Sequence, residues 1–218
     1  MIGGAVFLKV YKTLLKQNGH QGWWPGGTDF EICVGAILTQ NTSWSNVEKA
    51  ISNLKKEKLL NLEKMTRCSK AKLSLLIKPS GYFNQKATYL YELCSFLKKT
   101  PLKVLRKKKQ SEARYLILGV KGVGKETADS IMLYALGFPV FVVDTYTKRI
   151  FSRIGLSKSN TDYDELQDIF HKRLKHDPAL FGDYHAQLVA LAKAYCTKKP
   201  KCKECPLRRE HLCKYVQR

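Results

Sequence analysis

The fold of this chain is decided by one glycine-rich stretch, Gly119-Val120-Lys121-Gly122-Val123-Gly124-Lys125-Glu126-Thr127-Ala128-Asp129. Helical periodicity precedes and follows it, so the stretch is predicted to join two helices. Gly122 and Gly124 allow backbone N–H groups to approach a phosphate without obstruction by side chains. Lys121 and Lys125 add positive charge, and the start of the next helix, with Thr127, adds the positive end of its dipole. An ordinary corner between two helices is the alternative interpretation.

Most of the chain shows the same helical periodicity. Helices are expected over residues 5–17, 30–39, 45–57, 70–76, 84–98, 112–118, 127–136, 145–154, 164–174 and 182–195. Thr28 or Asp29 could cap the second of these helices. The one strand-like run, 140–143, has no partner strand and is interpreted as an extended, buried connection. The sequence therefore predicts an all-α fold, in which the glycine stretch is not a nucleotide-binding loop of a strand–helix–strand unit.

The charge of the chain indicates its partner. Its 218 residues carry 39 Lys and Arg against 18 Asp and Glu, a formal net charge of +21. Such an excess favours nucleic acid first and an anionic membrane surface second, although a ribosome-associated or merely basic protein has the same signature. No apolar run approaches the length of a membrane span, and the first ten residues are predicted to be helical rather than a signal peptide. We expect a cytoplasmic, nucleoid-associated protein with no membrane partner.

The seven cysteines fall into two groups. Cys33, Cys68 and Cys94 stand singly in apolar or helical surroundings and are predicted to be core residues. The others form the motif Cys196-x5-Cys202-x2-Cys205-x7-Cys213. Four thiols so close together in a reducing compartment indicate a metal or cluster site rather than free thiols. Zinc favours paired CxxC knuckles, whereas this motif has one CxxC with a cysteine standing off on each side, which favours a [4Fe–4S] cluster.

Asp144 follows the apolar run 140–143 and precedes a predicted helix. An aspartate at this position is most often an N-cap. The functional interpretation is a carboxylate at the end of a buried segment, facing a cleft.

The order of these motifs resembles the endonuclease III (HhH-GPD) superfamily of DNA glycosylases, in which a helix-hairpin-helix is followed by a catalytic aspartate. The segments 38–42 (Leu-Thr-Gln-Asn-Thr) and 79–87, together with the hairpin, look most like the bacterial 3-methyladenine glycosylase branch. The resemblance implies two helical domains, one over 28–137 and a discontinuous one over 1–27 and 138–218 that carries the iron–sulfur loop. It also implies a DNA cleft between them, with the hairpin at one lip and Asp144 at its base.

The resemblance also implies how a damaged base is reached. The nucleotide must be flipped out of double-stranded DNA into a pocket. Gln40 and Asn41 match the segment that fills the gap left in the stack, although two polar caps at a helix end would look the same. Trp23, Trp24 and Trp44 are candidates for walls that stack on an electron-poor alkylated base. Each could be a core residue instead, and the Pro/Gly loop around Trp24 favours it as a wall.

The resemblance assigns catalysis to Asp144, which would stabilise the oxocarbenium-like sugar or activate the attacking water. Bifunctional members carry a lysine directly before the Thr-Ala of the hairpin helix, where this sequence has Glu126. Lys125 is one residue away, a rotation of about 100° around a helix, so it is expected to face phosphate. Two further departures are Lys121 in place of a common proline, and a cysteine spacing that differs from the usual form.

These features predict a monomeric base-excision enzyme that hydrolytically removes an alkylated purine, such as 3-methyladenine, without strong lyase activity. A bifunctional glycosylase/lyase for oxidised bases is the alternative, and the presence of Glu126 argues against it. A non-catalytic DNA-binding module is the other alternative, and Asp144 argues against that, because a pure binder has no use for a carboxylate facing phosphates.

Overall fold

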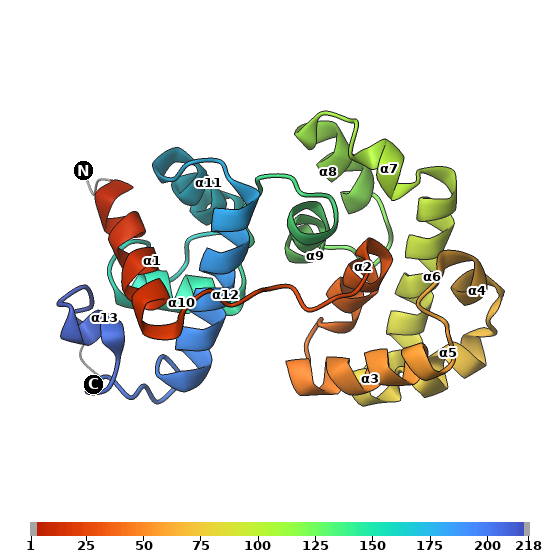
Figure 1. Ribbon diagram of the computed structural model, residues 1–218, viewed down its shortest axis with the longest axis horizontal. Coiled ribbons are helices and arrows are strands. Elements are labelled where there is room, and N and C mark those ends of the chain that lie inside the picture. The colour runs from red at the N-terminus through yellow and green to blue at the C-terminus, as the bar shows by residue number, and fades with distance from the viewer. Residues whose placement is uncertain (1–3, 216–218) are drawn as a thin grey trace. The chain divides into compact units, whose positions relative to one another are not determined.

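The computed structural model describes residues 4–215 as an all-helical protein, and no strand occurs among them. The expected all-α fold is therefore confirmed. The chain divides into two compact units, one made of Met1–Trp23 with Pro139–Arg218 and the other of Trp24–Phe138 (Figure 1). Within the described residues, no helix is both long and apolar enough to cross a membrane.

The unit Trp24–Phe138 is built around α2. Its elements are α2 (Asp29–Leu38), α3 (Trp44–Lys56), α4 (Leu62–Arg67), α5 (Lys70–Leu76), the 3₁₀ turn η1 (Lys78–Ser80), α6 (Phe83–Lys99), α7 (Leu102–Leu105), α8 (Gln110–Leu118), α9 (Lys125–Ser130) and the π-helical turn η2 (Ile131–Ala135). Thr28 caps α2 by accepting from the N–H of Glu31, as one of the two predicted caps should. All residues of α2 from Glu31 to Leu38 are buried. The helix packs against α3, α6, α9 and η2, which gives this unit a central apolar helix with amphipathic neighbours.

The second unit has an aromatic core. Its helices are α1 (Gly4–Asn18), α10 (Thr145–Arg153), α11 (Tyr163–Arg173), α12 (Pro178–Ala194) and α13 (Pro206–Arg209). Phe141 and Phe170 stack with ring centroids 3.7 Å apart, and Phe7 and Phe151 pack around them. Such rings remove much apolar surface from water and so contribute strongly to the stability of this core.

The run Val140–Val143 is an extended, buried connection, as predicted. Side chains of α11 satisfy its backbone in place of a neighbouring strand. The Phe141 N–H donates to Nε2 of His171 over 2.9 Å, and Gln167 Nε2 donates to the Phe141 carbonyl over 2.7 Å. Because buried backbone groups require partners, these bonds hold the segment that ends at Asp144.

Several predicted boundaries were wrong. The helix expected over 127–136 begins at Lys125, and its last part, Ile131–Ala135, is a π-helical turn. The last long helix begins at Pro178 rather than at Gly182, because Asp177 caps it and Pro178 occupies its first turn, so Gly182 lies inside the helix. Three short helices were missed, α4, α7 and α13, since one or two turns carry too little periodicity.

The cysteine prediction also needs one correction. Cys33 and Cys94 are buried as expected, but Cys68 is only half-buried. It ends α4, and its thiol lies beside the carbonyl of Ser69 in the short connection to α5. Cys68 is only half-buried because it lies in the short connection between two helices rather than on the buried face of either one.

Candidate functional site

The hairpin between α8 and α9 has the form that its glycines require. Gly122 has a φ of +88°, and a Cβ built there would lie 2.2 Å from the ring of Tyr89, so no other residue fits. Gly124 caps α9, is exposed, and would meet nothing within 4 Å if it carried a Cβ. Lys121 and Lys125 are exposed. The hairpin therefore offers an open, positively charged backbone surface.

A buried ion pair fixes the two hairpin helices to each other. Arg114 of α8 donates from Nε and Nη2 to the two carboxylate oxygens of Asp129 in α9, over 2.7 and 2.9 Å. The Asp129 side chain is fully buried, and that of Arg114 is 23% exposed. Paired donors in a planar fork set orientation as well as distance, so this contact orients the Arg114 and Asp129 side chains across the two helices.

Gln40 and Thr127, both predicted to contact DNA, contact each other. The Gln40 amide donates to the Gly122 carbonyl over 2.9 Å and to Oγ1 of the buried Thr127 over 3.0 Å. Gln40 thus ties the end of α2 to the hairpin. Its neighbour Asn41 is exposed and has a φ of +51°, the left-handed conformation that asparagine tolerates. Of this pair, Asn41 is the side chain presented to solvent.

Lys86, within the 79–87 segment, is a buried lysine that sequence reasoning did not single out. Its ammonium group donates to the carbonyl of Leu38 over 2.8 Å and to that of Ser80 over 2.7 Å. Burial lowers the pKa of Lys86 to about 8. The side chain joins the end of α2, just before Gln40, to the η1 turn.

Trp24 and Trp44 form two walls of a cavity of about 270 Å³ within the unit Trp24–Phe138. Their rings meet edge to face, with centroids 5.3 Å apart, and Tyr134 packs against Trp24 at 5.1 Å. A Cβ on Gly35 would come within 3.3 Å of the Trp24 indole, so this glycine makes room for the wall. Trp23 is half-buried and does not line the cavity.

Two carboxylates that sequence reasoning missed also line this cavity. Glu48 accepts from Nε1 of Trp44 over 3.0 Å and orients that ring. Glu31 is buried, lies 2.6 Å from Nζ of Lys55 and accepts from the N–H of Gly27. The pattern Thr28-x-x-Glu31 is a capping-box signal that could have drawn attention to Glu31. Lys55 also lines the cavity and offsets the charge of Glu31, so the aromatic walls and Glu48 are the features that favour a flat, electron-poor or cationic ligand.

Asp144 lies in the other unit and uses its two carboxylate oxygens differently. Oδ1 accepts from the N–H of Thr147 over 2.7 Å, which caps α10. Oδ2 is 3.5 Å from Nε2 of His185 on α12, a distance at which the attraction is chiefly electrostatic. Burial would raise the pKa of Asp144, but His185 and the Thr147 contacts outweigh it and lower that pKa below its ordinary value of 3.8. Asp144 is thus both the N-cap of α10 and a carboxylate that is held in its ionised form.

Replacing His185 with glutamine should move the acid limb of the pH–rate profile to higher pH. Glutamine can still donate to Asp144 but cannot carry charge, so the pKa of Asp144 should rise. The contacts of the ionised Asp144 stabilise the folded protein above the ordinary pKa of this carboxyl. That stabilisation is lost as pH falls through the lowered pKa of Asp144 in the folded protein. The rate of base release, the reaction that the sequence resemblance leads us to expect, measured between about pH 3 and 7, tests this shift. An acid limb at the same pH in both proteins would mean that His185 does not hold the charge of Asp144.

The hairpin residue Glu126 is placed in a different unit from Asp144. It is exposed in the first turn of α9, where a carboxylate is favoured by the helix dipole. Its backbone carbonyl accepts from Oγ of Ser130.

The four C-terminal cysteines lie in one neighbourhood. All four are free thiols, with Cys205 buried and the other three half-buried. Burial raises the pKa of Cys205 and of Cys213, and the nearby Cys196 raises both further. Among residues 4–215, the structure gathers no group of three His, Cys, Asp or Glu side chains closely enough to hold a metal ion. Four unbridged thiols on one loop nevertheless match the donor set of a cluster in kind and number.

Two arginines of α10 hold the cysteine loop. Arg149 donates to the carbonyl of Cys196 over 2.8 Å. Arg153 donates to the Thr197 carbonyl over 2.6 Å and lies 3.3 Å from the Cys196 thiol. Because α10 begins at Asp144, one helix links the candidate catalytic carboxylate to the loop.

The fold of the chain is that of endonuclease III. A solved complex of endonuclease III with DNA superposes with a TM-score of 0.81 at 21% identity, over 98% of this chain and 96% of the other. The chain also resembles the H. pylori 3-methyladenine DNA glycosylase MagIII, solved with bound 1,N6-ethenoadenine. That similarity has a TM-score of 0.75 and 32% identity, over 88% of this chain and 98% of the other.

The family follows from the sequence matches. Residues 34–176 match the model of the HhH-GPD superfamily of base excision DNA repair proteins, and the chain belongs to this superfamily. A protein of Methanocaldococcus jannaschii, provisionally named a DNA repair glycosylase, is 47% identical over 92% of this chain and 93% of its own length. Endonuclease III of Thermotoga maritima is 28% identical over 87% and 84%. The chain is thus a base excision repair DNA glycosylase that binds damaged DNA.

Proposed function

We propose that this glycosylase hydrolytically removes an alkylated purine, such as 3-methyladenine, from double-stranded DNA and acts as a monomer. The observation that carries the proposal is the cavity lined by Trp24, Trp44, Glu31 and Glu48. A purine alkylated on a ring nitrogen is electron-poor and often cationic. Indole faces attract such a ring through their quadrupoles, and the Glu48 carboxylate adds electrostatic attraction, whereas the charge of Glu31 is offset by Lys55, which also lines the cavity. The likeness to MagIII, with its bound ethenoadenine, supports this substrate class.

The chemistry proposed for Asp144 follows from its charge. As the N-glycosidic bond breaks, positive charge develops on the sugar, and a carboxylate held in its ionised form stabilises that charge or activates the attacking water. A cationic base is already a good leaving group, so little acid assistance is required. Glu126 would orient water or contact the base, and it cannot form a Schiff base with the sugar.

The remaining predicted residues would hold the DNA. Backbone N–H groups at Gly122 and Gly124, with Lys121 and Lys125, would bind phosphates along one strand. Asn41, with its exposed side chain, would fill the gap left by the flipped nucleotide, while Gln40 positions it from the hairpin. The net charge of +21 would make binding strongly dependent on salt.

A [4Fe–4S] cluster bound by Cys196, Cys202, Cys205 and Cys213 is part of the proposal. When bound, the cluster would cross-link the loop from Cys196 to Cys213 and would couple its folding to metal binding. Arg149 and Arg153 would keep the loop against α10.

Cluster binding predicts a measurable iron content. Purified under anaerobic conditions, the protein should contain about four irons and absorb broadly in the visible range. Cys205→Ser should lose most of this iron, whereas the matched control Cys68→Ser, outside the loop, should retain it. Stoichiometric zinc without iron would contradict the proposal.

The substrate proposal is tested with a panel of lesion duplexes containing 3-methyladenine, ethenoadenine or an oxidised pyrimidine. We expect release of the alkylated purines, an intact abasic site that is cut only after alkali, and no complex trapped by borohydride. Trp24→Leu should slow release by about 10- to 100-fold, since stacking of one base contributes about 1–3 kcal/mol. Trp24→Phe should retain most activity, and Trp23→Leu, outside the cavity, is the matched control.

Two outcomes would contradict the proposal. Efficient trapping by borohydride would show a lyase, with Lys125 or Lys148 as the nucleophile to test. Preferential release of the oxidised pyrimidine, unaffected by Trp24→Leu, would show that the aromatic cavity does not select the substrate.

A further inference from the structure

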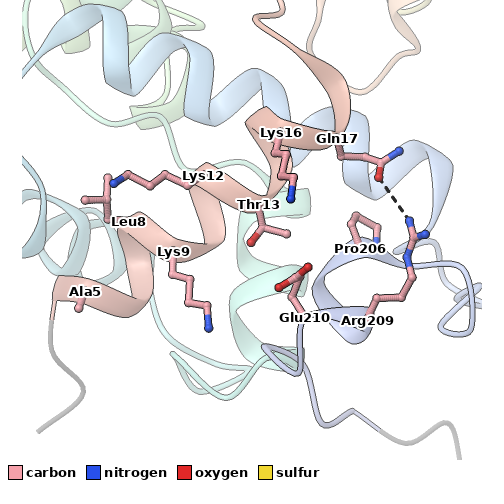
Figure 2. Close-up of a pocket in the computed structure, with 10 residues that line it drawn as sticks. All are labelled: Ala5, Leu8, Lys9, Lys12, Thr13, Lys16, Gln17, Pro206, Arg209 and Glu210. Carbon is pink, nitrogen blue, oxygen red and sulfur yellow. Dashed lines mark hydrogen bonds between the residues drawn. The ribbon is translucent and has the colours of Figure 1, made fainter.

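A basic groove lies within the unit that carries the cysteine loop, between α1 and α13. Figure 2 shows it lined on one side by successive lysines of α1 and on the other by the short helix that follows Cys205. Its volume is about 680 Å³. None of the residues proposed above for base excision lines it, so its features need a separate account.

Three lysines give the groove an ordered charge. Lys9, Lys12 and Lys16 stand at positions i, i+3 and i+7 of α1, which places them along one face of the helix. All three are exposed, and among the described residues none has a carboxylate within 4.0 Å. Arg209 adds a fourth cation, and its guanidinium contacts the neutral amide oxygen of Gln17 at 3.3 Å.

The groove is not uniformly basic. Glu210 projects into it from the end of α13, on the side facing the lysines (Figure 2). Leu8, 37% exposed, and Ala5 provide an apolar part at the beginning of α1. A nucleic-acid backbone carries phosphate at every step and would meet the Glu210 carboxylate and an apolar patch without compensation. A polypeptide that combines acidic, apolar and donor groups matches all three parts.

We propose that this groove is a docking site for an acidic, amphipathic helical segment of a partner protein. The lysines are spaced about 4.5 and 6 Å along the helix axis, from the rise of 1.5 Å per residue. Acidic side chains at i, i+3 and i+7 of a partner helix repeat that spacing, so carboxylates can pair with Lys9, Lys12 and Lys16 in register. An apolar side chain of the partner covers Leu8, as in other helix-in-groove complexes.

The test uses a fluorescein-labelled synthetic peptide of about 15 residues, with Glu at i, i+3 and i+7, Leu on the adjacent stripe, and Gln beyond that stripe as a donor to Glu210. Its binding to the full protein is followed by fluorescence anisotropy at about 0.15 M salt, where non-specific attraction between distant charges is screened. The double variant Lys9→Glu/Lys16→Glu should weaken binding by about tenfold or more. The control Lys49→Glu/Lys70→Glu makes the same charge change on exposed lysines of the other unit and should have little effect.

Four further measurements decide the outcome. A shuffled peptide of the same composition should bind more weakly, and Leu8→Ser should also weaken binding of the ordered peptide. Base release by Lys9→Glu/Lys16→Glu should match the wild type, which shows that the variant is folded. Equal weakening by both double variants, or equal binding of the shuffled peptide, would overturn the proposal. Loss of binding to undamaged duplex DNA by Lys9→Glu/Lys16→Glu, with peptide binding unchanged, would also overturn it and identify the groove as a nucleic-acid contact.

Discussion

The substitution Asp144→Asn is expected to slow base release by about 10²–10⁴-fold while leaving DNA binding intact. The amide has nearly the same shape as the carboxylate but cannot offset the positive charge that develops on the sugar. Binding to a lesion duplex should be equal or tighter, because one negative charge is removed from a protein that binds phosphates. Single-turnover rates with an alkylated duplex, together with anisotropy titrations, separate these two effects.

The structure supplies a matched control for this experiment. Asp162 caps α11 in the same unit, and its carboxylate accepts from the N–H of Glu165 over 2.8 Å, as Asp144 does for Thr147. Asparagine and aspartate are about equally good N-caps, so Asp162→Asn should leave activity unchanged. If Asp144→Asn released the base as fast as wild type, Asp144 would be a helix cap alone, like Asp162.

The second large effect is expected from the hairpin. Replacing Arg114 with leucine should lower the free energy of unfolding by about 3 kcal/mol, because it removes the guanidinium that compensates the buried charge of Asp129. The partial exposure of Arg114 places this value at the lower end of the range for buried pairs. Urea unfolding of the two proteins measures the difference.

Two comparisons separate burial of charge from loss of a contact. The double variant Arg114→Leu/Asp129→Leu should recover part of the stability, since two apolar groups leave no buried charge. Lys108→Ala breaks an i,i+4 pair on the same stretch of chain in which Glu112 is half exposed, whereas Asp129 is fully buried, so it should cost less than about 0.5 kcal/mol. Equal losses for Arg114→Leu and Lys108→Ala would show that the hairpin clamp contributes no more than a surface pair.

The motifs that can be found in this sequence are those whose chemistry lies within a few neighbouring residues. The hairpin is one, because glycine at position 122 permits the positive φ that the turn adopts. The cap at Thr28 is another, since the Glu31 N–H that it accepts from lies three residues away. The run from Val140 to Val143 could be interpreted as buried and extended from its apolar content and the lack of a partner strand.

Sequence patterns did not predict elements that are too short to show a period, or contacts that depend on residues far apart in the chain. A helix of one turn, such as α13, shows no period, and a glycine inside a helix, such as Gly182, resembles a boundary. Trp24 and Trp44 could be proposed as pocket walls from their type and loop context. That they meet edge to face around one cavity, while Trp23 does not line it, depends on how α2 and α3 pack.

Residue type and spacing by themselves determined the all-helical fold, the hairpin, the cysteine motif and the candidate aspartate. Three further features could be seen only once the helices were packed: His185 faces Asp144, Glu31 lines the aromatic cavity, and Lys86 joins the end of α2 to η1. The physical reason is the range of the interactions. Backbone propensity and capping act between residues a few positions apart, whereas a buried charge acquires its partner only when the packing of helices brings distant segments together.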